Sequence, residues 1–139
     1  MKTINEHLYI GGEKPSADAW LEDAKKGENA GQVGMYLIHN GVVRETAKKE
    51  IYSPGSEGRN VTGMDFSADE KKVQDAIHMA LGLKGVYAVK VWLADGRLEK
   101  GDNIMQVLIG ADCRPNCLDA LTKLVGTIKN ECVKELEIM

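Results

Sequence analysis

The sequence predicts an α+β fold in which helices pack on a mainly antiparallel sheet. Two observations support this prediction. Runs of β-branched and apolar residues alternate with segments whose apolar residues recur at helical spacing, and no internal repeat or low-complexity segment interrupts the alternation. The 139 residues are 43% hydrophobic and 28% charged, which is ordinary usage for a globular protein. We therefore expect a single domain over residues 1–139.

The N-terminal part is expected to form a short strand, a helix and a longer strand. Leu8–Ile10 is a short apolar run that stops at two glycines, and Pro15 with Ser16 introduces a helix over Ala17–Ala24. The segment Gly34–Arg44 has the apolar and β-branched composition of a buried strand, and it ends at a basic residue. This exit from a core strand is a candidate functional position.

The middle of the chain combines an irregular segment with a further strand and helix. Residues 45–60 are rich in polar and turn-forming residues and show no period, so we expect an exposed loop. Val61–Phe66 is the next strand. Ser67 and Glu70 have the spacing of a capping box, which predicts that a helix begins there and ends at Gly82.

The C-terminal part predicts two adjacent strands and a long helix. Val86–Leu93 and Ile104–Ile109 are apolar runs joined through glycine-containing turns, which favours two neighbouring antiparallel strands. A helix is expected to begin at Pro115 and to bury one stripe of its surface. That stripe consists of Cys117, Leu118, Leu121, Leu124, Val125, Ile128 and Cys132.

Charge and composition argue against several classes of function. The chain has 18 Lys and Arg against 21 Asp and Glu and few aromatic residues, so it lacks both a general cationic field and stacking surfaces for nucleic acid. Its apolar runs are shorter than the ~20 residues of a membrane span, and residues 1–7 lead into no signal-like apolar core. We expect a cytoplasmic protein that binds neither nucleic acid nor membranes.

Three cysteines lie in the last quarter of the chain, at positions 113, 117 and 132. This odd and sparse count predicts reduced thiols. We expect no metal site, because the spacing lacks a Cys-x-x-Cys knuckle and because Cys117 and Cys132 lie on the apolar stripe. Cys113 differs, since it falls where a strand meets a helix, beside Arg114, and such an environment favours the thiolate. A thiol-dependent enzyme with Cys113 as nucleophile is therefore one open hypothesis.

Basic residues at the ends of the predicted elements are the remaining candidates for chemistry. The sequence contains no Walker loop, Rossmann glycine pattern, His-Glu-x-x-His or Gly-x-Ser-x-Gly motif. A concentration of cations would suit a ligand that carries phosphate or carboxylate, although most lysines and arginines are solvated surface groups. The residues alone thus predict an α+β domain with a possible anion site formed by Arg44, Cys113, Arg114 and Lys129.

Two ordered patterns carry a family resemblance. The first is Gly34, six residues, and then Gly41-Val42-Val43-Arg44. The second comprises Gly96-Arg97-Leu98-Glu99-Lys100-Gly101-Asp102, the strand 104–110, Ala111-Asp112-Cys113-Arg114, Leu118-Asp119-Ala120 and Ile128-Lys129. In order and spacing these segments resemble the large, catalytic subunit of molybdopterin synthase. The resemblance covers most of the chain and implies an α/β-hammerhead-like fold.

The resemblance implies a sulfurtransferase of molybdenum cofactor biosynthesis. Such an enzyme passes two sulfurs to cyclic pyranopterin monophosphate from the C-terminal thiocarboxylate of a small ubiquitin-like subunit, and the product is molybdopterin. By correspondence, Lys129 would be a catalytic acid/base or charge stabiliser, and Lys134 is a looser candidate for a second catalytic lysine. Arg44, Cys113 and Arg114 would bind the substrate. The resemblance also implies a homodimer with a small subunit at each end, and no metal or other cofactor.

The chain departs from the family pattern at several positions. A His-Arg pair of the family is Leu93-Ala94 here, and the active-site histidine before the second arginine is Cys113. Lys134 comes two residues early, and the sequence stops at Met139 without the usual tail. The alternative hypothesis is therefore a diverged, non-catalytic paralogue that binds a pterin, another anionic ligand or a partner protein.

Overall fold

The computed structural model describes residues 1–46, 51, 53–55 and 60–139. The exposed loop expected over residues 45–60 lies largely outside the described residues. Its two described ends lie side by side, because Thr46 and Asn60 form an isolated antiparallel bridge. The amide of Val61 donates a 2.6 Å hydrogen bond to the carbonyl of Glu45. The chain therefore leaves and re-enters the described fold at one place.

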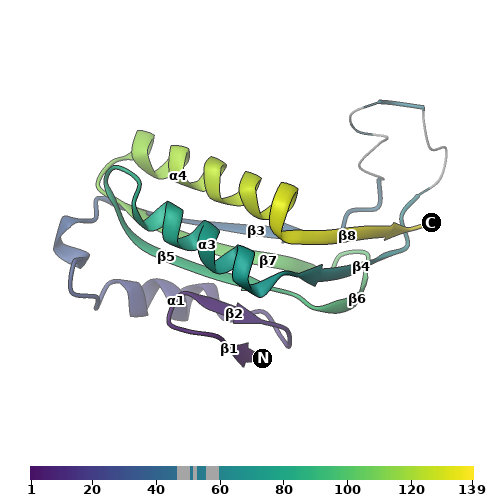
Figure 1. The fold of residues 1–139 in the computed structure, drawn as a ribbon, viewed down its shortest axis with the longest axis horizontal. Coiled ribbons are helices and arrows are strands. Elements are labelled where there is room, and N and C mark those ends of the chain that lie inside the picture. Colours follow the sequence, from purple (N-terminus) through teal and green to yellow (C-terminus); the bar gives the residue numbers. More distant parts are fainter. Residues whose placement is uncertain (47–50, 52, 56–59) are drawn as a thin grey trace.

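The described part of the chain contains eight strands, three α-helices, one 3₁₀ turn and one π-helical turn (Figure 1). The strands are β1 (Lys2–Thr3), β2 (Leu8–Ile10), β3 (Met35–Val42), β4 (Gly63–Ala68), β5 (Val86–Leu93), β6 (Gly96–Glu99), β7 (Asn103–Ala111) and β8 (Val133–Ile138). The helices are α1 (Ala17–Ala24), α3 (Glu70–Leu81) and α4 (Arg114–Thr127), with η1 (Ala30–Gln32) and the π-helical turn η2 (Ile128–Cys132).

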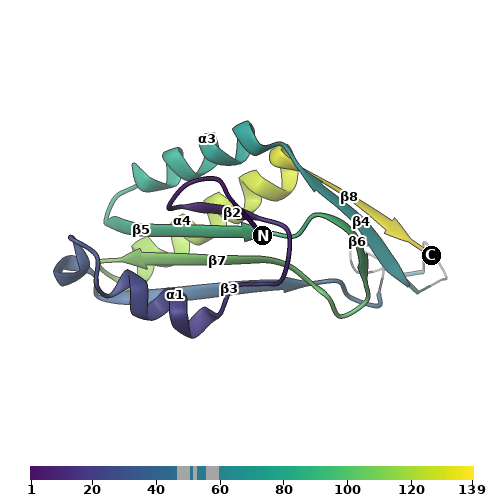
Figure 2. The same cartoon turned by 90° about the horizontal axis from the view of Figure 1, so that it is seen from below.

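The strands form two sheets. The large sheet has the order β1-β2-β5-β7-β3, and the small sheet has the order β6-β4-β8. Neighbouring strands are antiparallel throughout, except that β2 runs parallel to β5. Figure 2 shows the small sheet extending from one end of the large one. The predicted α+β class with a mainly antiparallel sheet is confirmed.

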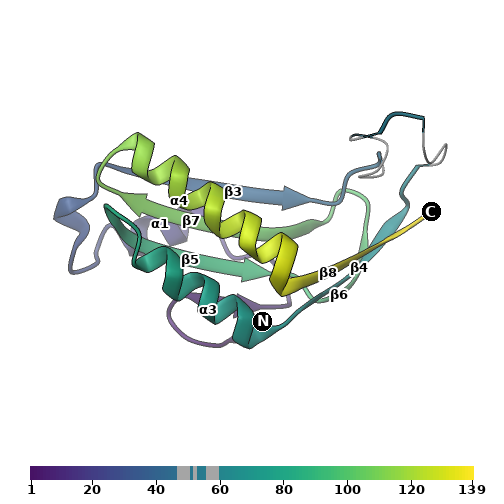
Figure 3. The same cartoon turned by 45° about the horizontal axis from the view of Figure 1, so that its top comes forward.

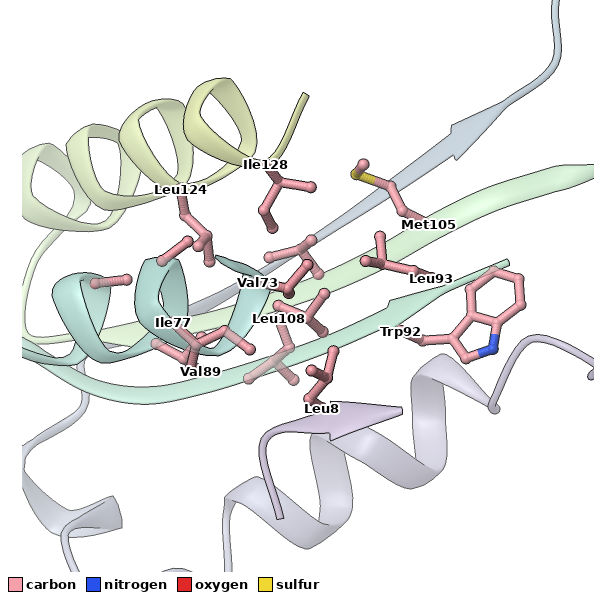
Figure 4. Close-up of a cluster of buried hydrophobic side chains, with 14 of the residues drawn as sticks. Leu8, Val73, Ile77, Val89, Trp92, Leu93, Met105, Leu108, Leu124 and Ile128 are labelled. Carbon is pink, nitrogen blue, oxygen red and sulfur yellow. The ribbon is translucent and has the colours of Figure 1, made fainter. Parts of the chain in front are cut away.

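The large sheet separates two helical layers. Helices α3 and α4 cover one face, and α1 lies against the other (Figures 1 and 3). Leu124 and Ile128 point from the α4 side toward the sheet residues Leu108 and Met105, and all four are buried (Figure 4). Strand β7, between β5 and β3, is buried on both faces, which explains its largely apolar sequence.

The structure corrects the predicted start of α3. Strand β4 continues to Ala68 because it pairs with β8, and Ser67 lies opposite Lys134 in that pairing. Asp69 is the N-cap of α3, and its carboxylate accepts a 3.1 Å hydrogen bond from the amide of Lys72. The Ser67–Glu70 capping box was therefore wrong. A neighbouring strand that was not predicted holds Ser67 in extended conformation.

The end of the last helix also differs from the prediction. Helix α4 is α-helical only to Thr127, and a π-helical turn leads from it into β8. The predicted stripe is largely correct because Cys117, Leu124, Ile128 and Cys132 are buried. Leu118 is instead 44% exposed.

The difference in exposure between the buried Leu124 and the exposed Leu118 on α4 gives a stability prediction. Replacing Leu124 by alanine should lower the free energy of unfolding by about 2–5 kcal/mol, because it opens a cavity between α4 and the sheet. Leu118→Ala on the same helix is the matched control, and its effect should stay below about 1 kcal/mol. Urea unfolding followed by circular dichroism measures both values. Equal losses would contradict the described orientation of α4.

Candidate active site

Several ionisable side chains lie at the end of the large sheet where the small sheet begins. Helix α4 runs back along the sheet from the end of β7, so its C-terminus returns to the end where β3 stops (Figure 3). Lys129 lies there on the π-helical turn, and Glu135 lies on the strand that follows. His39 is on β3, and Arg44 comes two residues after it ends. We call these four residues the junction site.

Lys129 is held in place by the buried residues around it. Ile128 and Cys132, at the two ends of the π-helical turn, are 0% and 3% exposed. The carbonyl of Cys132 accepts a 2.7 Å hydrogen bond from the amide of Asp69 at the start of α3. The Lys129 Nζ atom faces the Oε1 atom of Glu135 at 4.0 Å, and the Glu135 side chain is only 16% exposed. The turn therefore directs a cation toward a largely buried carboxylate.

His39 faces the same group from β3. Burial lowers the pKa of its imidazole, and the nearby charge of Lys129 lowers this pKa further. Gly41 packs closely beside the ring, because a Cβ atom at this position would lie 3.9 Å from the His39 Nε2 atom and only 3.3 Å from the Met105 Cγ atom. His39 is therefore a neutral imidazole beside a lysine ammonium at neutral pH.

Arg44 is positioned by the backbone that precedes it. The amide of Val43 donates to the carbonyl of Asp102 at 2.9 Å, and the carbonyl of Val43 accepts from the amide of Gly101 at 2.7 Å. Val43 itself is 2% exposed. The turn between β6 and β7 thus fixes the backbone at the exit of the strand.

The junction site holds every buried side-chain nitrogen or oxygen that lacks a hydrogen-bond partner among the described residues. These atoms are the Nε2 of His39, the Nε of Arg44 and the Oε1 of Glu135. Buried polar groups are normally hydrogen-bonded, and leaving one unpaired is costly. Lys129 is paired with Glu135 and its charge acts on His39, whereas Arg44 lies five residues farther along the chain than His39. Unpartnered donors and acceptors near a lysine suit a polar, anionic ligand.

Cys113 and Arg114 lie elsewhere. Both are exposed at the N-terminus of α4, and they are separated from Lys129 by the length of that helix. The fifteen residues from Arg114 to Lys129 correspond to about 22 Å at 1.5 Å per residue. One chain therefore brings Arg44 and Lys129 to one end of the sheet and Cys113 with Arg114 to the other.

The surroundings of Cys113 are acidic as well as basic. The Asp112 carboxylate accepts a 2.8 Å hydrogen bond from the Asn116 side chain and a further one from Cys113, and these bonds lower the pKa of Asp112. Cys113 is the N-cap of α4 but makes no side-chain capping bond. Its contact with a carboxylate gives the hypothesis of a nucleophilic thiol no support.

Lys134 does not join Lys129. Successive residues of a strand point to opposite faces, and Glu135 lies opposite the buried Phe66 in the pairing of β8 with β4. Lys134 lies opposite the exposed Ser67, so its side chain projects from the face of the small sheet opposite to that of Glu135. There it lines a hollow together with acidic residues such as Glu131. This placement does not favour a catalytic role.

A separate cavity of about 320 Å³ lies on the α1 side of the large sheet. Its lining includes His7, Tyr36 and Lys90, and Lys90 is ion-paired with Asp23 of α1. None of the site residues expected from the sequence lines this cavity.

The fold and the junction site define an α+β domain with a basic site at the edge of its helical layer, and solved structures with a similar fold include molybdopterin synthase proteins. Molybdopterin synthase from Staphylococcus aureus matches with a TM-score of 0.71 and 18% identity, over 94% of this chain and 89% of that one. Molybdopterin cofactor biosynthesis protein E from Burkholderia multivorans matches with a TM-score of 0.71 and 15% identity, over 97% of this chain and 88% of that one. A chain in a complex of subunits 1 and 2 of molybdopterin-converting factor from Helicobacter pylori matches with a TM-score of 0.66 and 16% identity, over 95% of this chain and 84% of that one.

The family follows from the sequence comparison. Residues 13–131 match the MoaE protein family, so the chain belongs to this family of molybdenum cofactor biosynthesis. No curated protein matches the chain. The low identities to the solved structures agree with a diverged member.

Two further observations concern other classes of site. None of the helices in the described ranges has the length and apolar character needed to cross a membrane. Within the same ranges, no group of three or more His, Cys, Asp or Glu side chains is arranged to hold a metal ion.

Sequence reasoning missed two residues of the junction site. His39 carries a signal, since it is a lone histidine in a largely apolar strand, two residues before Gly41. Its neighbour Lys129, however, is ninety residues away in the sequence. Glu135 carries none, because the strand that orients it was not predicted. Both depend on the return of α4 to the end of β3.

The cysteines give a chemical prediction. Burial raises the pKa of the Cys117 and Cys132 thiols, whereas Cys113 is exposed. Because the thiolate is the reactive form, an aromatic disulfide reagent should titrate only Cys113 rapidly in the folded protein and all three thiols in denaturant. Cys113→Ser should abolish the rapid phase. Rapid reaction of a second thiol in that variant would contradict the described packing of α4.

Proposed function

We propose that the protein transfers sulfur from the C-terminal thiocarboxylate of a small ubiquitin-like subunit to cyclic pyranopterin monophosphate, yielding molybdopterin. Membership of the MoaE family supports this reaction. The observation that carries the proposal is the junction site, where Lys129 faces Glu135 and its charge acts on His39. Arg44, at the exit of β3, and His39 each have a buried side-chain nitrogen without a hydrogen-bond partner. The three free cysteines agree with the cytoplasmic location included in this proposal.

The site suits the charges of this reaction. The substrate carries a phosphate, the donor tail ends in an anion, and attack on the acyl carbon produces negative charge on oxygen. The Arg44 guanidinium is suited to the phosphate because its donors form a planar fork. The Lys129 ammonium, held by Glu135, is suited to the developing oxyanion. No step of this scheme calls for a metal.

A small partner subunit is part of the proposal. The Helicobacter pylori structure named above is a complex of two subunits of molybdopterin-converting factor. For this chain we propose a ubiquitin-like sulfur carrier whose C-terminal tail reaches Lys129. Lys134, on the exposed face of β8, is then better placed to contact the partner than the substrate.

We also propose a homodimer, in which a second copy completes the site. Arg114 and Lys129 of one chain are about 22 Å apart along the helix, too far for one small substrate to touch both. Cys113 and Arg114 can therefore serve as substrate-binding residues only toward the junction site of another copy. Two such contacts related by a two-fold axis would close the assembly.

The direct test is an assay of the purified protein with cyclic pyranopterin monophosphate and a thiocarboxylated small subunit, in which dithiolene formation and complex assembly are followed together. Turnover supports the proposal. Binding of substrate or partner without turnover would identify the non-catalytic paralogue instead.

Substitution of the two lysines separates their roles. Lys129→Ala should lower kcat at least about 100-fold, because it removes the charge that stabilises the oxyanion. Lys134→Ala should leave kcat within about fivefold and raise the KM for the partner, because it removes about 1 kcal/mol of surface attraction. Steady-state kinetics measures both effects, and circular dichroism checks the fold. A wild-type kcat in Lys129→Ala would remove this residue from the mechanism.

Mixing two inactive variants tests the shared site. If Arg114 of one copy serves Lys129 of the other, a dimer of Lys129→Ala with Arg114→Ala contains one intact site and one doubly altered site. Random subunit exchange should then restore about a quarter of wild-type activity. Mixing Lys129→Ala with Arg44→Ala is the matched control, since both residues belong to the same end of one chain and no intact site can form. Absence of recovery in the first mixture would contradict the shared site.

A further inference from the structure

We propose that His39 is the general base of the sulfur-releasing half of the reaction, where its Nε2 atom accepts a proton from the water that hydrolyses the acyl–sulfur bond. The assignment rests on the proposed function and adds a catalytic residue to it. It is carried by the position of His39 in the junction site, where its Nε2 atom is buried without a partner.

The chemistry of the donor requires such a base. When the sulfur of a thiocarboxylate adds to an unsaturated carbon of an acceptor, the π bond of that carbon breaks and its electron pair moves to the neighbouring heteroatom, which takes up a proton. The product is a thioester that still joins the acceptor to the donor tail. Water must then add to the acyl carbon, and the C–S bond must break. The sulfur stays on the acceptor with the bonding electron pair, and the tail becomes a carboxylate. One proton of the water goes to the base and the other goes to the released thiolate.

His39 has the atoms that this step needs. With the proton of the neutral ring on Nδ1, the Nε2 atom carries a lone pair, and no group of the described chain donates a hydrogen bond to it. The Lys129 ammonium lies close enough for its charge to act on the ring. A buried imidazole nitrogen without a hydrogen-bond partner and a lysine whose charge acts on the same ring thus supply a base and a cation close to each other.

The neighbours of His39 keep it neutral. Its cross-strand partner on β7 is Val107, which is uncharged and fully buried. On α4, Asp119 and Lys123 pair with each other at 3.0 Å and are each more than half exposed. The facing charges are therefore Lys129 on the π-helical turn and, beyond it, Glu135 on β8. Burial and then Lys129 lower the pKa of His39, so the ring remains a base through neutral pH.

The other histidines do not fit this role. The Nδ1 atom of His7 lies 2.8 Å from the carbonyl of Val89, and its Nε2 atom lies 3.3 Å from Glu6. His7 also lines the cavity on the α1 side of the sheet. His78 is exposed on α3.

The test compares His39→Gln with His78→Gln in the assay with thiocarboxylated subunit and cyclic pyranopterin monophosphate. Glutamine keeps a polar side chain at position 39 but cannot take up the proton. His39→Gln should lower turnover at least about 100-fold and should accumulate the thioester between the subunit and the substrate, detected by mass spectrometry. His78→Gln should match the wild type. Turnover of His39→Gln at the wild-type rate without the thioester would overturn the assignment.

A second measurement uses the unaltered protein. The pKa of His39, followed by NMR of its ring protons, should coincide with the acid limb of the kcat profile, below about 6.5. An acid limb that does not follow the titration of His39 overturns the assignment even if the variant does not fold. A wild-type protein that forms no dithiolene refutes the proposed function itself, and the role of His39 with it. Normal wild-type turnover with a normal His39→Gln refutes the role of His39 alone.

Discussion

The π-helical turn between α4 and β8 is the constraint on which the rest of the molecule depends. Ile128 and Cys132 bury its two ends, and the amide of Asp69 binds the carbonyl of Cys132. This one turn ends the helix, starts the strand that borders the small sheet and orients Lys129. Single π-turns often occur at functional sites because the extra residue per turn changes side-chain direction. Here the direction that results is toward Glu135.

The length of α4 sets the second feature of the molecule. A helix that spans the sheet must leave its N-terminal residues far from its C-terminal ones, so Arg114 cannot approach Lys129 within one chain. The family resemblance assigns both residues to one active site, whereas the fold places them at opposite ends of α4 and its following turn. The proposed homodimer would reconcile these facts, because a two-fold axis can set one end of a chain against the other end of its partner.

Local patterns predicted the fold better than the site. The buried face of α4 was predictable because Leu124 and Ile128 recur at helical spacing, and the strands beneath it were predictable from their apolar runs. Strand β8 was not, since Lys134 and Glu135 break any alternation of apolar and polar residues and the apolar Leu136 is 65% exposed. The misplaced start of α3 at Ser67 has the same cause. A helix cap was inferred from neighbouring residues at a position where pairing with β8, distant in the sequence, keeps the backbone extended.

The site could be predicted only in part for a related reason. Arg44 and Lys129 stand at the ends of elements, and the sequence marks them as basic residues in such places. The relation of Lys129 to His39 and Glu135 is tertiary, and no spacing in the sequence encodes it. An orphaned imidazole nitrogen also becomes visible only when burial and hydrogen bonds are known. His39 and Glu135, which have a direct part in the proposed site, are thus the residues that could not be assigned to it from the sequence.

The central claim is that the junction site, and not the cavity beneath α1, receives the substrate. The most direct measurement is NMR of the histidine ring resonances of the whole protein during titration with cyclic pyranopterin monophosphate. The account predicts that the His39 resonances shift with saturation while those of His7, which lines the other cavity, stay unchanged. Saturating shifts at His7 with no change at His39 would contradict it.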